Sequence, residues 1–304
     1  MVGGVIPVLY SFFTANGVPN LDAHDLQLTW AMENGATGVA LLGLASEGAA
    51  LSLSERMAVV SRTAEILSPN AILLATIRPD DDIVQIAKCA LKHRSRVGVI
   101  VQVGRDPALS LKQVRVLCDD KGLATKVDIG MQLAPGLIDT EFTGASLRAE
   151  PDLLRCLGFL KAEYNSVDLD LHLRQLNAPI RLLVGRHGQN LMDYLRIGAI
   201  GVIPGTEMTG PLHAILQLWQ DDKKEDALHA YGAVAPYVDF AMQDLDTVID
   251  LGRAVTAHVL DIPIGTRRTT TARDPRAFQS AVDMWLPYWI AMKSKLAAGS
   301  APSK

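Results

Sequence analysis

Short apolar runs rich in β-branched residues alternate with longer amphipathic stretches along the first two thirds of the chain. Eight such runs occur, the clearest being Gly38–Leu42, Ala71–Thr76, Val97–Val103, Val127–Leu133 and Ile180–Val184. The runs are continuously apolar, which indicates strands buried on both faces, as parallel sheets require. Eight βα units within roughly 220 residues therefore predict an α/β fold of the (β/α)8 TIM-barrel class.

The remaining three strands are predicted at Val5–Phe13, Leu157–Tyr164 and Gly201–Pro204. Ser52 followed three residues later by Glu55 forms a capping box, which predicts a helix after the second strand. The alternative fold is a doubly wound open sheet. That fold normally has a glycine-rich nucleotide fingerprint after its first strand, and this chain has none there.

The alternation stops after the eighth strand, and the rest of the chain is predicted to be helical. The expected helices are Pro211–Gln220, Glu225–Val234, Pro236–Leu260 and Pro275–Lys295. The predicted organisation is thus a barrel over residues 1–220, a C-terminal helical extension over 221–295 and a disordered tail over 296–304.

Charge and cysteine content narrow the class of protein. The net charge of −4 comes without a long run of either sign, which argues against a nucleic-acid or membrane partner. No apolar run approaches 18 residues, so no membrane span is predicted. Three separate cysteines, Cys89, Cys118 and Cys156, argue against a disulfide framework or zinc site and favour a reducing cytoplasm.

A lysine interrupts the sixth apolar run, where chemistry is expected. Catalytic groups of barrels lie at the C-terminal ends of strands, and Lys161 is placed there with Glu163 on the same face. Two interpretations stay open. Lys161 could form a structural ion pair with Glu163, or burial could favour a neutral amine that attacks a carbonyl group to form a Schiff base.

Four segments, in this order and spacing, resemble the dihydrodipicolinate synthase and N-acetylneuraminate lyase family of class I aldolases. They are Gly4-Val5-Ile6-Pro7-Val8, Gly43-Leu44-Ala45-Ser46-Glu47-Gly48, Leu160-Lys161-Ala162-Glu163 and Gly198-Ala199-Ile200-Gly201-Val202-Ile203. The resemblance runs from about Gly4 to about Trp285 and includes the extra C-terminal helices.

The resemblance implies that Lys161 forms a Schiff base with pyruvate or another 2-keto acid, without a cofactor or metal. The residues that it places around the substrate are Gly43, Ala45, Ser46, Glu47, Gly185 and Ile203. It also implies a small-molecule substrate and a homo-oligomer, either a dimer or a tetramer. For Glu47 we also expect a structural role, because a carboxylate before a helix often holds backbone N–H groups.

The chain departs from the family pattern at the proton relay. Gln132 stands where the family has a tyrosine, and an amide can hydrogen bond but cannot pass a proton as a hydroxyl does. Leu137 and Ile138 stand where dihydrodipicolinate synthases carry an arginine. We therefore expect a substrate other than that of a true dihydrodipicolinate synthase. Glu163 is the leading substitute relay.

Other residues are secondary candidates for the relay, namely Ser46, Glu47, His187 and Glu207. His187 is expected to be an exposed loop residue.

The first function hypothesis is a Schiff-base lyase, either an aldolase or a dehydratase. The second is a degenerate barrel that binds a keto or sugar acid without turnover. The third is a phosphate-binding barrel enzyme that uses Arg186. A metal-dependent aldolase is disfavoured, because no His, Asp or Glu set has ligand spacing.

Overall fold

The computed structural model describes residues 2–135, 142–176, 178, 180–269 and 274–299. In these segments eight parallel strands form one sheet, with neighbours in the order β1-β8-β7-β6-β5-β4-β3-β2. The strands are β1 (Gly4–Val5), β2 (Gly38–Leu41), β3 (Ile72–Ile77), β4 (Val97–Gln102), β5 (Val127–Leu133), β6 (Phe159–Ala162), β7 (Arg181–Val184) and β8 (Ala199–Val202).

The sheet closes on itself between its first and last members. Isolated parallel bridges join Val5 to Ala36 and Val8 to Ala40, so the chain around β1 also contacts β2. The Ala40 N–H donates to the Pro7 carbonyl over 2.8 Å. The predicted (β/α)8 barrel is confirmed, and the open-sheet alternative is wrong.

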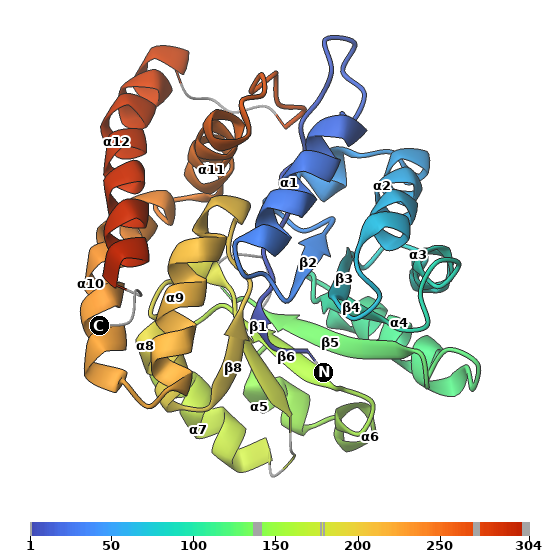
Figure 1. The fold of residues 1–304 in the computed structure, drawn as a ribbon. Helices are drawn as coiled ribbons and strands as arrows, with labels where there is room; N and C mark the ends of the chain where they lie inside the picture. Colours follow the sequence, from blue (N-terminus) through green and yellow to red (C-terminus); the bar gives the residue numbers. More distant parts are fainter. Residues whose placement is uncertain (1, 136–141, 177, 179, 270–273, 300–304) are drawn as a thin grey trace.

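Helices surround the barrel on its outside (Figure 1). They are α1 (Leu21–Glu33), α2 (Leu53–Ile66), α3 (Ile83–Ala90), α4 (Pro107–Asp119), α5 (Gly144–Arg148), α6 (Pro151–Leu154), α7 (Ser166–Leu176), α8 (Leu191–Arg196) and α9 (Thr209–Gln220). The predicted capping box is confirmed at the start of α2. The Ser52 N–H donates to Glu55 Oε2 over 2.8 Å, and the Glu55 N–H donates to Ser52 Oγ over 3.3 Å.

The first strand is much shorter than predicted. Only Gly4–Val5 is regular strand, where Val5–Phe13 was expected, and beyond it Val8 and Phe13 take part only in isolated bridges. Pro7 has no N–H to give to a ladder, which limits the regular pairing. The eighth strand likewise ends at Val202, before Pro204. In both places, residues that were predicted as strand belong to the loops around the barrel opening.

Three long helices follow the barrel: α10 (Lys224–Ala241), α11 (Leu245–Leu260) and α12 (Pro275–Gly299). The predicted break at Pro236 is wrong, since that proline lies inside α10. The chain breaks instead at residues 242–244, because Asp244 Oδ1 accepts the Thr247 N–H and caps α11. Helix α12 packs on α9, α10 and α11 and runs past Leu296, where the tail was expected to begin. None of the described helices is long and apolar enough to cross a bilayer.

The expectation that the cysteines stay unpaired is wrong for two of them. Cys118 in α4 and Cys156 after α6 form a disulfide, with their Cα atoms 6.0 Å apart. They are 38 residues apart in sequence, but α4 and α6 pack against each other. Cysteine usage therefore no longer argues for a reducing compartment.

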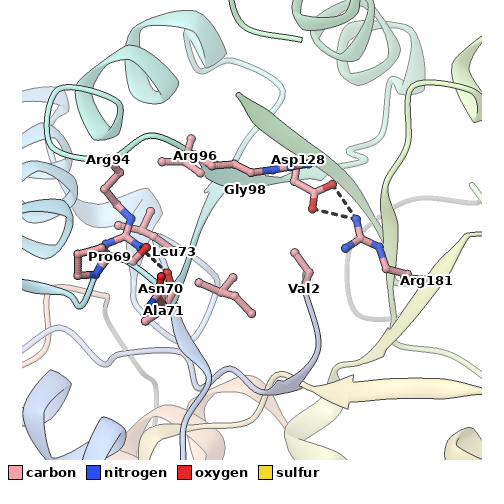
Figure 2. Close-up of a pocket in the computed structure, with 12 residues that line it drawn as sticks. Val2, Pro69, Asn70, Ala71, Leu73, Arg94, Arg96, Gly98, Asp128 and Arg181 are labelled. Carbon is pink, nitrogen blue, oxygen red and sulfur yellow. Dashed lines mark hydrogen bonds and ion pairs between the residues drawn. The ribbon is translucent and has the colours of Figure 1, made fainter. Parts of the chain in front are cut away.

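A partly buried ion pair links β5 and β7 at the N-terminal ends of the strands (Figure 2). Arg181 on β7 donates to both carboxylate oxygens of Asp128 on β5, each over 2.8 Å, and to the Gly158 carbonyl. Gly158 lies between the two strands, and a Cβ there would lie 2.0 Å from Asp128 Oδ1. The absence of a side chain at this position is what lets the pair form.

We expect Asp128→Ala to lower the free energy of unfolding by roughly 3 kcal/mol, because it leaves a mostly buried guanidinium without its partner. Arg115→Ala is the matched control. It removes an exposed pair with Glu150, which is expected to contribute less than about 1 kcal/mol. Urea denaturation of both variants measures the difference, and equal losses would contradict the interpretation.

His24 introduces a pH-dependent contact between α1 and α2. Its Nε2 lies 2.7 Å from Thr63 Oγ1, and that hydroxyl donates to the Val59 carbonyl, so the histidine N–H is the donor to Thr63. Burial lowers the pKa of His24 to about 4, while Asp25 opposes this shift and Arg62 adds to it. The folded protein therefore holds this imidazole neutral.

Because the unfolded chain binds a proton at His24 below its ordinary pKa of 6.5, stability is expected to fall as the pH drops from 6.5 towards 4. The His24 contribution to this loss is about 3 kcal/mol. His24→Gln keeps a donor for Thr63 and is expected to flatten the slope in that window, whereas His229→Gln at the surface should not. Denaturation midpoints measured across this pH range check the difference.

Candidate active site

Lys161 lies inside the barrel near the C-terminal end of β6. Two residues earlier, Phe159 is fully buried in the barrel interior, so the strand period of two also points Lys161 inward. Gly130 on β5 makes room for Phe159, since a Cβ there would lie 2.2 Å from the aromatic ring. Lys161 is therefore one layer above this ring and only 9% exposed.

Lys161 forms the predicted pair with Glu163. Its Nζ lies 3.1 Å from Glu163 Oε1, which also accepts the backbone N–H of Arg186 over 3.1 Å. The other carboxylate oxygen accepts a hydrogen bond from the Gln132 side-chain amide. Gly185 permits this arrangement, because a Cβ there would collide with the Glu163 side chain. The three predicted catalytic residues, Lys161, Gln132 and Glu163, thus form one cluster.

The surroundings of Glu163 keep it ionised. Burial raises the pKa of its carboxyl group, but the charge of Lys161 and the hydrogen bonds from Gln132, the Arg186 N–H and Lys161 outweigh burial. The pKa of Glu163 therefore lies below its ordinary value. At neutral pH Glu163 is therefore an ionised hydrogen-bond acceptor for Lys161, while Gln132 can only hold the carboxylate in place.

A cavity of about 450 Å³ opens above Lys161. Its walls come from the C-terminal ends of the strands, the loops after them and the connection between α10 and α11. Four of the predicted site residues line it in addition to Lys161, namely Gly43, Ala45, Glu163 and Ile203. Arg186 and His187 also line it, so the loop after β7 faces the lysine.

The loop after β2 offers two backbone donors to this cavity. The N–H groups of Ser46 and Glu47 donate within the turn, to the carbonyls of Gly43 and Leu44. The N–H groups of Leu44 and Ala45 have no acceptor among the described residues, and both residues line the cavity. The Leu44 and Ala45 N–H groups are therefore the backbone donors of this loop that stay available for a carboxylate.

Glu47 points away from the cavity, and the structural role expected for it is confirmed. Its Oε1 accepts the Thr269 N–H over 2.9 Å and lies 3.5 Å from Arg267 Nε. Arg267 also pairs with Asp246 and Asp250. The carboxylate thus fastens the loop after β2 to the C-terminal extension. The Arg267 guanidinium is therefore already paired within the fold.

The prediction that His187 is an exposed loop residue is wrong. His187 is only 4% exposed, its Nδ1 accepts the Gly205 N–H over 3.1 Å, and its Nε2 lies 3.1 Å from Glu207 Oε1. Glu207 also accepts hydrogen bonds from the hydroxyls of Tyr10 and Tyr237. Burial, and then the charge of Glu207, raises the pKa of both tyrosines. The lone pair of Nδ1 is taken up by the Gly205 N–H, and Nε2 lies beside the Glu207 carboxylate.

The sequence interpretation missed the wall that the C-terminal helices contribute. Residues of the α10–α11 connection line the cavity, among them Gln243 and Asp244. A continuous helix was predicted there, although Asp244 and Thr247 have the spacing of a helix cap. Gly185, Ser46, Glu47 and Gln132 do not line the cavity. Leu137 and Ile138 lie outside the described residues.

A larger cavity of about 690 Å³ lies at the opposite, N-terminal end of the strands (Figure 2). Its lining includes the paired Asp128 and Arg181, together with Arg94, which donates to the carbonyls of Leu67 and Ala71. These groups already have partners within the fold, and residues at this end of a barrel serve stability. The cavity at Lys161 is therefore the candidate active site. No three His, Cys, Asp or Glu side chains of the described segments gather into a metal-binding group.

Comparison with known proteins finds similarity in structure alone. No protein-family model and no curated protein sequence matches the chain. The 4-hydroxy-tetrahydrodipicolinate synthase of Methylacidiphilum fumariolicum SolV is similar, with a TM-score of 0.81 and 16% identity over 98% of this chain and 99% of that one. The dihydrodipicolinate synthase of Rhodopseudomonas palustris has a TM-score of 0.77 and 17% identity, over 96% and 97%.

A third similar structure is the Ruminococcus gnavus sialic acid aldolase, with a TM-score of 0.79 and 15% identity over 97% of this chain and 99% of that one. A catalytic lysine mutant of that aldolase is similar to the same extent. Because these matches extend over nearly the whole of each chain, they include the C-terminal helices as well as the barrel. This chain therefore has the fold of the dihydrodipicolinate synthases and of sialic acid aldolase.

Proposed function

We propose that the protein is a Schiff-base-forming lyase, an aldolase or dehydratase, that acts on pyruvate or another 2-keto acid. The observation that carries the proposal is a buried lysine at the end of β6, which faces a cavity of about 450 Å³ and contacts an ionised carboxylate. The shared fold with a sialic acid aldolase that has a catalytic lysine supports it. True dihydrodipicolinate synthesis is not proposed, because Gln132 stands in the place of the family tyrosine.

The proposed reaction begins when Glu163 takes a proton from Lys161. The free amine then adds to the ketone carbon of the keto acid, Glu163 returns the proton to the departing hydroxyl, and water leaves to give the protonated imine. The protonated imine draws electrons from the adjacent carbon, which permits C–C bond formation or cleavage, or elimination of water. The N–H groups of Leu44 and Ala45 would hold the keto-acid carboxylate, and Val8, Ala40 and Ile203 supply apolar wall around the reacting carbon.

Borohydride trapping against a panel of 2-keto acids tests the proposal. Reduction of the imine fixes the keto acid to Lys161, and mass spectrometry of the digested chain locates the adduct. The proposal would be abandoned if no keto acid in the panel left an adduct on Lys161.

One observation favours a second candidate, a barrel that forms the imine without turning it over. Gln132 donates a hydrogen bond to Glu163, the carboxylate that contacts Lys161. Its side chain is an amide, which cannot relay a proton to a leaving group. Stable trapping with pyruvate, together with no turnover of any aldol or dehydratase substrate, would support this alternative. The homo-oligomer, dimer or tetramer, and the cytoplasmic location stay predictions, and light scattering checks the first.

A further inference from the structure

Arg186 is a charged residue of the cavity for which the proposed steps have no use. It lines the same cavity as Lys161, and no Asp or Glu of the described residues forms an ion pair with it. Its Nε is shielded from solvent and has no hydrogen-bond partner in the described part of the chain. A guanidinium group presents a planar fork of N–H donors that matches a carboxylate or phosphate.

The other charged groups of the cavity already have partners. Lys161 and Glu163 form a pair, and His187 contacts Gly205 and Glu207. The Asp244 carboxylate accepts hydrogen bonds from the N–H and hydroxyl of Thr247, at 2.8 and 2.9 Å, and so belongs to the cap of α11. Among the described groups that line the cavity, the charge of Arg186 is therefore the one left for a ligand.

The backbone fixes Arg186 relative to the lysine. Its N–H donates to the same Glu163 oxygen that contacts Lys161. Arg186 and His187 both adopt left-handed backbone conformations, with φ of 47° and 57°. Residues other than glycine rarely adopt these conformations. Such conformations persist where the surroundings enforce them, and they concentrate at functional sites.

We propose that the substrate carries a second anionic group, a carboxylate or a phosphate, at the end remote from its keto-acid carboxylate, and that Arg186 binds this group. The inference rests on the proposed function, because imine formation at Lys161 and the Leu44 and Ala45 N–H groups orient the ligand. It narrows the substrate class to dianionic 2-keto acids and makes Arg186 a determinant of specificity.

Trapping with matched keto acids tests the inference. 2-Oxoglutarate has the carbon chain of 2-oxopentanoate with a carboxylate in place of the terminal methyl, and 2-oxo-4-phosphonobutanoate supplies a phosphonate. Arg186→Gln is expected to raise the half-saturating concentration of 2-oxoglutarate by about 10- to 100-fold and to leave that of 2-oxopentanoate nearly unchanged. Arg196→Gln, at an exposed residue, is the matched control and should change neither.

Calorimetry makes the test independent of imine formation. 2-Hydroxyglutarate and 2-hydroxypentanoate have no ketone, so their affinities report the anion site alone. The inference is supported if the parent chain prefers the diacid, Arg186→Gln removes this preference and Arg186→Lys keeps part of it. This result would stand even if trapping fails and the proposed lyase activity is rejected. Equal affinities for the two hydroxy acids, or a preference that Arg186→Gln leaves intact, overturn it. Tighter trapping of the phosphonate than of the dicarboxylate would assign the second group as phosphate.

Discussion

Replacing Lys161 with alanine is expected to abolish borohydride-dependent labelling of the chain by pyruvate and to reduce lyase turnover by roughly 10⁴-fold or more. The expected loss is large because the imine is the electron sink of the proposed reaction, and no other lysine lines the described cavity. Mass spectrometry of the labelled chain measures the first effect, and steady-state kinetics on the best keto acid measures the second.

The alanine variant also leaves the Glu163 carboxylate without its cation, which lowers stability. Lys161→Arg is therefore the matched variant, since it keeps the positive charge beside Glu163 but lacks a nucleophilic amine. It should fold like the parent chain and still fail to form the adduct. Lys126→Arg, at an exposed position, should be labelled like the parent. Labelling of Lys161→Arg to the parent level would contradict the assignment.

The sequence alone predicted the barrel because the alternation of apolar strands and amphipathic helices is a local pattern that repeats along the chain. Buried parallel strands such as β4 have apolar side chains on both faces, and this pattern survives without any knowledge of tertiary contacts. The same strand period placed Lys161 and Glu163 on one face, and the structure confirms their contact. Both conclusions depend on residues within one strand or one βα unit.

What the sequence did not predict depends on residues far apart in the chain. His187 is buried by Gly205 and Glu207, and Glu47 is held by Thr269, 222 residues away. No local pattern of hydropathy records such pairings, so an exposed loop was the expectation for His187. The Cys118–Cys156 disulfide was missed for the same reason, because packing of α4 on α6 brings the two residues together.

The helical extension shows a further difference between the predicted and the observed structure. A helix boundary was expected at Pro236, because proline removes a backbone hydrogen bond, but this proline lies inside α10. The true boundary at Asp244 brings Gln243 and Leu245 to the cavity above Lys161. Local helix propensity thus predicted a continuous helix for residues that form part of the cavity wall. No contact with a substrate was expected of them.

Replacing Glu163 with glutamine is expected to slow imine formation by about 10²- to 10⁴-fold, the range of a general base. Glutamine has nearly the shape of glutamate but cannot take the Lys161 proton. The pH profile separates this role from a structural one. Because the pKa of Glu163 is lowered, the parent carboxylate stays ionised to pH values below its ordinary range, and activity should fall only below that range. The variant should lose this acid limb.

Two matched variants complete the test of Glu163. Glu47→Gln changes another buried carboxylate by the same substitution, but one that contacts Thr269 and not Lys161, so its pH profile should keep the acid limb. Gly185→Ala leaves every charge in place and forces the Glu163 side chain to move, since a Cβ there would lie 2.2 Å from Oε1. It should therefore slow trapping as Glu163→Gln does. Parent-like trapping rates in both Glu163→Gln and Gly185→Ala would show that the carboxylate holds the fold together and does not move the proton.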